Sequence, residues 1–329
     1  MNRTDCAKPT VKYEPTWEIT DGSKLTNFIT CPRQYFFEYI LGWRPETPSN
    51  HLIFGTSWHL AMEALLLGKS PTEAYQLFLT DYRKTFGPET DELYKPKTPE
   101  NAELVIFAYA AKYRDDLSNF KVLYTEIAGT VAIAEDRNLH FRMDSICQDL
   151  KTGRIFSLEH KTGSRSYNWE YQWPLSMQVG TYTHVLYCMY DPEIVSGVKF
   201  NASFFTKGVR NWAAFHAGDN VKYKPPFEFM RLPMYRTQPQ MQQWLWNATF
   251  WVDQLEWQWQ LFAECDESDA LMACFPQNPT ACSKYFGCDY RDFCSAWRNP
   301  LQHCAEPPLG FKIEHWNPAA EEATEVFTL

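Results

Sequence analysis

The amino-acid sequence predicts an α/β fold, in which helices flank a central β-sheet. Three observations predict it: helix-type patterns dominate residues 1–120, strand-type segments alternate with turns from residue 121, and a helix followed by further strands comes after them. We therefore expect a helical N-terminal portion over residues 1–120, a core of sheet and helix over 121–236, a long helix with a cysteine-rich segment over 237–300, and a tail over 301–329.

The N-terminal portion is expected to consist of short helices. Ser23 can cap a first helix that ends near Thr30, because its hydroxyl can accept a hydrogen bond from an N–H group of the first turn. Pro32, favoured at the first helical position, begins a second helix that runs to Tyr39, with Gly42 just beyond its end. Further helices are expected over residues 54–67, 71–86 and 99–115.

The core is expected to begin with a three-stranded meander. β-branched and aromatic residues predict strands over 122–134, 139–150 and 154–161, joined by polar turn residues. A helix over 177–190 and strands over 195–206 and 227–234 are expected to follow. From residue 238 to residue 264, apolar side chains recur at the spacing of a helix that packs one face against a core.

The composition excludes several classes of protein. No apolar stretch approaches the roughly 18 residues of a membrane span. Ten cysteines are too few for a disulfide scaffold, and the N-terminus lacks the apolar part of a secretory signal, so we expect a cytoplasmic protein with free or metal-bound thiols. The net charge of −9 argues against coating of nucleic acid by bulk electrostatics, although bound divalent cations can reverse the sign of an acidic site.

Two acids, a lysine and an amide are expected to meet at one face of the sheet. Glu159 and Lys161 are two residues apart in a strand and so share a face, and Asp144 lies on the neighbouring strand. Gln178 and Tyr182 lie one turn apart on the helix that follows. Carboxylates select magnesium or manganese, which can acidify a water for hydrolysis of a phosphodiester. The alternative is a set of solvated strand ends and an ordinary polar helix face.

These residues resemble the motifs of a known family. Asp144, Glu159-His160-Lys161 and Gln178-Val179-Gly180-Thr181-Tyr182 are similar to motifs II, III and Gln-x-x-x-Tyr of the PD-(D/E)xK nuclease superfamily, in its RecB-like branch. Cys31-Pro32-Arg33-Gln34-Tyr35 and Gly55-Thr56-Ser57-Trp58-His59 resemble the N-terminal signatures of that branch. The resemblance spans residues 22–296 and implies a restriction-endonuclease-like core, a mixed central sheet flanked by helices.

The resemblance also implies a metal site. His59, Asp144, Glu159 and the main-chain carbonyl of His160 would bind Mg²⁺ or Mn²⁺. Three further acids near the site in sequence are expected to be structural or surface carboxylates, although the first could hydrogen-bond His59: Glu63, Glu126 and Asp149.

The remaining motif residues would carry out the hydrolysis. Lys161 would orient the attacking water and help to lower its pKa, Gln178 would position that water, and the phenol of Tyr182 could hold phosphate or water. The resemblance thus implies a metal-dependent DNA exonuclease that acts on single-stranded ends, with 5′ to 3′ polarity favoured. The alternatives are an endonuclease of the same superfamily, and a DNA-binding or recombination-complex subunit with a vestigial site.

A cysteine-rich segment follows the predicted core. Cys282, Cys288 and Cys294 are separated by five residues each, and no Cys-x-x-Cys pair is present, which argues against a zinc ribbon. Iron-sulfur relatives in the RecB-like branch, such as AddB-type helicase-nucleases and the CRISPR-adaptation nuclease, show one cysteine before the core and three after it. That arrangement implies a [4Fe-4S] cluster held by this triplet and Cys31. The alternative fourth ligands are Cys274 and Cys304.

Residues 196–236 contain seven Lys and Arg against two acids, interleaved with aromatic residues. Such a segment can follow a single strand by phosphate attraction and base stacking. The alternative is two strands joined by a solvated loop. Arg165 and Lys207 are the cations best placed for phosphate contact. The expected setting is the cytoplasm of a bacterial cell or of a phage-infected host, where DNA, a second copy of the chain, or recombination or CRISPR proteins would be the partners.

Overall fold

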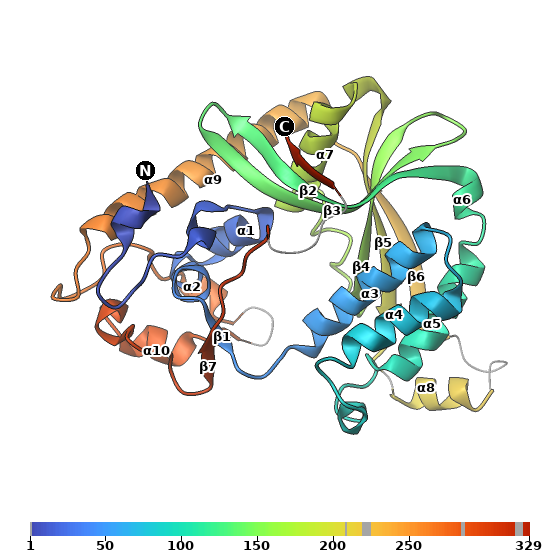
Figure 1. The fold of residues 1–329 in the computed structure, drawn as a ribbon, viewed down its shortest axis with the longest axis horizontal. Coiled ribbons are helices and arrows are strands. Elements are labelled where there is room, and N and C mark those ends of the chain that lie inside the picture. Colours follow the sequence, from blue (N-terminus) through green and yellow to red (C-terminus); the bar gives the residue numbers. More distant parts are fainter. Residues whose placement is uncertain (1, 208, 219–224, 284–286, 320–324) are drawn as a thin grey trace.

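The computed structural model describes residues 2–207, 209–218, 225–283, 287–319 and 325–329. Its centre is a six-stranded mixed sheet in the order β6-β5-β4-β3-β2-β8 (Figure 1). The strands are β2 (Phe120–Ala134), β3 (Arg137–Asp149), β4 (Ile155–Gly163), β5 (Val195–Phe205), β6 (Phe227–Met234) and β8 (Glu325–Thr328). The predicted meander is present: β2, β3 and β4 pair antiparallel, and β5 runs parallel to β4 after a helical crossover.

Helices cover both faces of the sheet, as expected for this fold class. On one side lie α3 (Asn50–Leu66), α4 (Pro71–Tyr82) and α5 (Pro99–Lys112), which share a core with the far end of β5 (Figure 1). On the other side lie α1 (Gly22–Thr30), α7 (Met177–Met189) and the long α9 (Gln238–Glu264). In the described part of the chain, no helix is both long and apolar enough to cross a membrane.

The two ends of the chain meet beside the sheet. The short strand β1 (Trp43–Pro45) pairs antiparallel with β7 (Phe311–Ile313), and α10 (Arg291–Ala296) packs its Phe293 edge-on against Trp43. Figure 1 shows this group of N- and C-terminal elements side by side with α1 and α2 (Pro32–Tyr35). The predicted tail therefore contributes two strands, β7 and β8, that the sequence pattern did not indicate.

Local boundaries differ from the prediction at several helices. α3 begins at Asn50 instead of residue 54, and α4 and α5 end at Tyr82 and Lys112 instead of residues 86 and 115. The N-cap of α1 is Asp21, whose Oδ1 accepts a hydrogen bond from the N–H of Lys24 at 2.7 Å, so Ser23 lies inside the helix. The second predicted helix is α2 followed by a π-helical turn, Phe36–Ile40. The remaining short helices are Asp116–Asn119, Val209–His216, Arg3–Cys6, Pro15–Glu18, Pro88–Thr90, Pro192–Ile194, Pro279–Ala281 and Pro300–His303.

A glycine in the Gln-x-x-x-Tyr motif lets two helices pack closely. A Cβ atom added at Gly180 of α7 would lie 2.0 Å from Nε1 of the buried Trp244 of α9. The substitution Gly180→Ala should therefore push α7 away from α9 and lower the free energy of unfolding by about 1 to 3 kcal/mol. Denaturant unfolding followed by circular dichroism measures this loss.

A second helical glycine is the matched control. A Cβ at Gly55 of α3 would have no atom within 4 Å, so Gly55→Ala should be neutral or stabilise the protein by about 0.5 to 1 kcal/mol. Equal unfolding free energies for the two variants would contradict close packing of α7 on α9.

Candidate active site

The two predicted acids, Asp144 and Glu159, lie at the point where β3 and β4 separate. Ladder pairing of these strands covers residues 146–148 and 155–157, and Asp144 and Glu159 lie two residues beyond its end. The backbone N–H of His160 donates a hydrogen bond to Oδ2 of Asp144 at 2.6 Å. A side-chain carboxylate thus accepts from an N–H group of β4 at the point where the two strands diverge.

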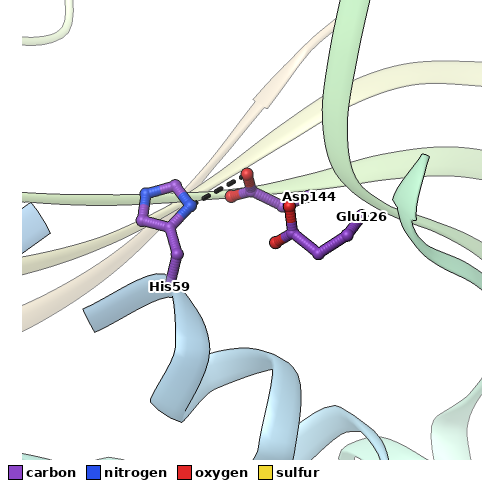
Figure 2. A group of neighbouring side chains, drawn as sticks. All are labelled: His59, Glu126 and Asp144. Carbon is purple, nitrogen blue, oxygen red and sulfur yellow. Dashed lines mark hydrogen bonds and ion pairs between the residues drawn. The ribbon is translucent and has the colours of Figure 1, made fainter. Parts of the chain in front are cut away.

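A histidine and a second carboxylate converge on Asp144. Nδ1 of His59, which α3 carries toward the sheet, lies 3.0 Å from Oδ1 of Asp144 (Figure 2). Glu126 lies opposite Asp144 in the β2–β3 ladder. One ligand atom from each of the three residues lies within 4.8 Å of the others, and this is the one such group in the described ranges. Figure 2 shows the three side chains directed toward one another.

Glu126 is the site residue that the sequence interpretation missed, since it was expected to be structural. Arg142 donates to Oε2 of Glu126 from Nε at 3.0 Å and from Nη2 at 2.9 Å, which fixes the carboxylate beside Asp144. Glu126 also has a φ of 46°, a left-handed conformation that is uncommon for a residue with a Cβ. A count back from the hairpin turn would not have found it, because a register shift between Ala132 and Ala134 moves the pairing by one residue.

The other predicted catalytic residues gather around Glu159. Nζ of Lys161 and Nε2 of Gln178 donate to the same oxygen, Oε1 of Glu159, at 2.8 and 2.7 Å. Nε2 of Gln178 also lies 3.0 Å from the hydroxyl of Tyr182, which donates to the backbone carbonyl of Arg142. Oε2 of Glu159 is buried and has no hydrogen-bond partner among the described residues. A buried carboxylate oxygen of this kind is available to bind a cation.

The carboxylates strongly perturb one another. Burial and the nearby Asp144 raise the pKa of Glu126 to about 7, against the opposing effect of Arg142. Burial and Asp144 also raise the pKa of Glu159. Burial alone would lower the pKa of His59, but Asp144 outweighs it and raises that pKa to about 9, while His59 in turn holds the pKa of Asp144 well below its usual range. A divalent cation would relieve this repulsion, so the donor set fits Mg²⁺ or Mn²⁺.

The side chain of His160 takes no part in this group. It is buried beside Asn201, whose Nδ2 lies 3.1 Å from its Nδ1, and burial lowers the pKa of His160 to about 3. Asp149 accepts hydrogen bonds from the turn at Thr152, which fits its expected structural role. The hydrogen bond found for His59 goes to Asp144, and none among the described residues joins it to Glu63.

A cavity of about 830 Å³ adjoins the site. Lys161, Gln178 and Tyr182 line one end, and Gln34 and Cys288 line the other. Lys161, Gln178 and Tyr182 therefore share this space with Cys288 of the cysteine-rich segment, whereas His59, Asp144 and Glu159 are not among its lining residues.

The structure brings the four predicted cysteine ligands together. The thiols of Cys31, Cys282 and Cys294 all act on Cys288, whose pKa is raised by burial and by these neighbours. No three of the four Sγ atoms form a group within 4.8 Å in the described chain, although a tetrahedral zinc site with bonds of about 2.3 Å requires that spacing. Residues 284–286, between two of the ligands, lie outside the described residues.

A buried arginine lies among these thiols. Arg33 is 5% exposed and donates to the carbonyl of Phe275 at 2.8 Å, but its Nη1 has no hydrogen-bond partner in the described part of the chain. Burial lowers the pKa of Arg33, and four thiols oppose that effect, two of them outside the predicted ligand set: Cys294, Cys274, Cys31 and Cys265. A buried guanidinium without a carboxylate fits a site that holds an anionic group, as a cysteine-ligated iron-sulfur cluster is.

The two alternative ligands lie elsewhere in the same region. Sγ of Cys274 lies 3.4 Å from Sγ of Cys265, and Sγ of Cys304 donates to the carbonyl of Pro300. Both are buried, and neither is among the thiols that act on Cys288.

Residues 196–236 were predicted to bind nucleic acid. In the described part of this segment, several of the charged and aromatic side chains make contacts within the protein. Arg231 forms an ion pair with Asp116, and Arg236 donates to backbone carbonyls of the loop before α7. Its aromatic residues Phe204, Phe205 and Trp212 are buried, so the alternative of two strands and a loop fits this part of the chain. Residues 219–224 lie outside the described residues, as do the side chains of residues 209–211.

The two cations expected to contact phosphate differ. Arg165 forms ion pairs with Glu170 and Glu228, and Lys207 is exposed two residues beyond the end of β5. A phosphate would therefore have to compete with two carboxylates for Arg165.

The fold and the site together define a metal-dependent nuclease: a mixed sheet flanked by helices holds carboxylates and a histidine that fit a divalent cation, beside a lysine. The family model described as the PD-(D/E)XK nuclease superfamily matches residues 22–295, and the chain belongs to this superfamily. A comparison with curated proteins found no match.

Proposed function

We propose that this protein is a DNA exonuclease of the RecB-like iron-sulfur branch, which hydrolyses phosphodiester bonds at single-stranded ends with 5′ to 3′ polarity favoured. The observation that carries the proposal is the convergence of Asp144, Glu159 and His59 next to Lys161 and Gln178. These residues come from two strands and two helices, and an unrelated fold would not bring this combination to one point.

The metal ligands would be His59, Asp144, Glu159 and the carbonyl of His160, with Glu126 as a further carboxylate. In an extended strand the N–H and C=O groups of one residue point to the same side, and the N–H of His160 points to Asp144. Bound Mg²⁺ or Mn²⁺ supplies a Lewis acid that binds phosphate oxygens and lowers the pKa of a water. The vacant Oε2 of Glu159 supports its role as a ligand.

Lys161 and Gln178 would hold the attacking water. Both donate to the same oxygen of Glu159 in the absence of substrate, so both have donors within reach of a water that lies beside that carboxylate. The ammonium of Lys161 would also stabilise negative charge on that water and on the phosphate. Tyr182, which is bonded to Gln178 and to the Arg142 carbonyl, would keep the amide oriented.

Exposed aromatic side chains support action on a single strand. The loop between β4 and α7 carries Tyr167 and Tyr171, which are 87% and 71% exposed, with ring centroids 6.0 Å apart. Trp169 of the same loop is buried against Phe204, which anchors the loop, and Trp173 lines the cavity. Exposed rings beside a catalytic cavity can stack on unpaired bases.

The proposal is tested with end-labelled DNA. Anaerobically purified protein with Mn²⁺ should shorten a linear single strand stepwise from its 5′ end, leave a circular single strand intact and degrade blunt duplex slowly. Cleavage of the circle would establish the endonuclease alternative. Tight binding without cleavage in Mg²⁺ and Mn²⁺ would establish the alternative of a subunit with a vestigial site.

We also propose that Cys31, Cys282, Cys288 and Cys294 hold a [4Fe-4S] cluster. The mutual effect of their thiols and the buried Nη1 of Arg33, which has no hydrogen-bond partner among the described residues, support it. The cluster would join the two chain ends beside the catalytic cavity. A tetrahedral zinc site is the alternative, and metal analysis of the purified protein distinguishes the two.

The substitution Glu126→Gln should weaken binding of Mn²⁺ at least tenfold. It removes a carboxylate charge next to Asp144 but keeps the shape of the side chain and a hydrogen-bonding oxygen for Arg142. Isothermal titration of the metal-free protein with Mn²⁺ measures the dissociation constant. Glu63→Gln, which changes an acid one turn along α3 from His59 and outside this group, should leave that constant unchanged. Equal affinities for both variants and the unaltered protein would mean that Glu126 is only structural.

A further inference from the structure

The cavity beside the catalytic group is lined mostly by uncharged polar and aromatic side chains. With histidine neutral, four of its described lining residues carry a charge, and they are two acids and two cations: Asp21, Asp289, Arg142 and Lys161. Each of the cations forms an ion pair with a carboxylate of the active site, Glu126 or Glu159. The lining of the cavity therefore has no excess of positive charge with which to bind a row of phosphates.

A tryptophan from the C-terminal part of the chain reaches this cavity. Trp316 lies three residues after β7, and Figure 1 shows that the segment after β7 runs back past α1. The antiparallel pairing of β7 with β1 holds this segment in place. The N–H of Glu314 also donates to the carbonyl of Gly42 at 2.7 Å. The position of Trp316 in the cavity is therefore fixed by contacts on its N-terminal side.

The indole ring of Trp316 is anchored at its N–H group. Nε1 donates to Oδ2 of Asp21 at 3.1 Å, and Oδ1 of the same carboxylate caps α1. Trp316 is 37% exposed, and no other aromatic ring of the described residues packs against it. Trp173, which also lines the cavity, differs because its ring already lies 4.2 Å from that of Phe200. Trp316 thus offers an oriented aromatic surface that has no stacking partner in the described part of the chain.

The anchor of Trp316 has a defined position relative to the proposed metal site. Asp21 pairs with His140 of β3 in a short parallel bridge, and the N–H of His140 donates to the carbonyl of Thr20 at 2.8 Å. His140 precedes Asp144 by four residues on this strand, which corresponds to about 13 Å. A group that contacts Trp316 is therefore separate from the phosphate at the metal, but it can belong to the same strand of DNA.

Neutral hydrogen-bonding groups accompany the ring. Ser23 and Gln172 line the cavity with exposed side chains, and neither side chain has a hydrogen-bond partner among the described residues. A hydroxyl and an amide can each donate and accept a hydrogen bond. The edge of a nucleobase carries donors and acceptors, and its faces are flat and uncharged. A base matches this combination of groups better than a phosphate does.

We propose that the cavity binds an unpaired base of the DNA strand, and that this base stacks on the indole ring of Trp316. The proposal rests on the nuclease function proposed above and adds a base-binding residue to it. Inside a duplex a base is stacked and paired, so it has to leave the stack before a side chain can cover its face. Binding at Trp316 therefore favours a single strand over a duplex.

The substitution Trp316→Ala tests the proposal through binding in Ca²⁺, which is measured by fluorescence anisotropy of a labelled thymidine oligonucleotide. The Kd should rise about tenfold, which corresponds to the loss of one stack between a base and an aromatic ring. The slope of log Kd against log salt should stay the same, because no phosphate contact is removed. Trp316→Phe keeps a ring and should keep most of the affinity.

Oligonucleotides with a single abasic site at successive positions show whether a base is bound. At one position, the missing base should raise the Kd of the unaltered protein about tenfold and leave the Kd of Trp316→Ala unchanged, because both changes remove the same stack. The control Trp246→Ala removes a 64% exposed tryptophan of α9 outside the cavity, and it should bind every oligonucleotide as the unaltered protein does.

Two results would overturn the base site. One is a Trp316→Ala protein that binds the intact oligonucleotide with unchanged affinity. The other is a loss that adds to the loss from the abasic site at every position, since Trp316 would then act through the fold. The melting temperature of each variant is measured alongside. Trp316→Leu, which keeps apolar bulk without a ring, takes the place of an alanine variant that does not fold.

The measurements also separate this proposal from the proposed function, because none of them requires cleavage. A protein that shows the expected abasic position but never cuts DNA contradicts the nuclease function alone. A protein that cuts DNA but shows no such position contradicts the base site alone.

Discussion

Replacement of Lys161 by alanine is expected to lower the rate of DNA cleavage by about two to four orders of magnitude, with DNA binding in Ca²⁺ largely unchanged. The ammonium lies 2.8 Å from Glu159, and Lys161 lines the cavity together with Gln178. Without it, no side-chain ammonium stabilises negative charge on the water and on the phosphate. Single-turnover cleavage of an end-labelled strand in Mn²⁺ measures the rate, and fluorescence anisotropy measures binding.

A lower cleavage rate of Lys161→Ala must be distinguished from a loss of folded protein. Glu159 is 2% exposed, so removal of its partner leaves a buried carboxylate, and the melting temperature of the variant is measured alongside. Lys112→Ala, which removes an exposed lysine outside the cavity, should cleave at the rate of the unaltered protein. A folded Lys161→Ala protein with full activity would refute the assigned role.

Replacement of Cys288 by serine is expected to give colourless, poorly soluble protein. Loss of one thiolate ligand should release the cluster, and with it the link between chain segments about 250 residues apart, which is worth about 3 to 5 kcal/mol on the loop-entropy model. Absorbance near 420 nm and iron and sulfide analysis of anaerobically purified protein measure the cluster, and thermal unfolding measures the stability.

A matched cysteine outside the group provides the control. Cys188 of α7 is exposed, and Cys188→Ser should keep the colour, the iron content and the solubility of the unaltered protein. Cys304→Ser tests the alternative fourth ligand and should also keep the cluster. A stable brown Cys288→Ser protein would show that the ligand assignment is wrong, and colourless unaltered protein with stoichiometric zinc would favour the zinc alternative.

The helices and strands were largely predictable because their signals are local. The predicted bounds of the strand 227–234 and the helix 238–264 agree with β6 and α9, and the start at Met177 agrees with α7. A capping box at Thr237 and Gln240 marks the beginning of α9 within four residues of sequence. Side-chain alternation and helix spacing report which face is buried, and they need no knowledge of distant residues.

The site was only partly predictable. Glu159 and Lys161 share one strand, Gln178 and Tyr182 share one helix, and Asp144 lies on the adjacent strand, so these relations followed from spacing, whereas the contact of Gln178 with Glu159 joins α7 to β4. The participation of Glu126 depends on the register of β2 against β3, and a register is a property of two segments rather than one.

The charged segment, residues 196–236, is a second place where local patterns did not determine the contacts of the side chains. Contact with a nucleic acid and a solvated loop were the two alternatives for its cations, and Arg231 and Arg236 instead have internal partners. Whether a charged side chain is solvated, paired or buried depends on what the rest of the chain brings beside it.

The sequence by itself determined the order of helices and strands, the motif residues and their shared faces, because these follow from spacings of two, three and four residues. The tertiary structure alone decided where β3 and β4 separate, that Glu126 joins His59 and Asp144, and that the thiols of Cys31, Cys282 and Cys294 act on Cys288. These features arise from contacts between residues far apart in the chain, and their energies depend on burial and on neighbouring charges that local patterns do not encode.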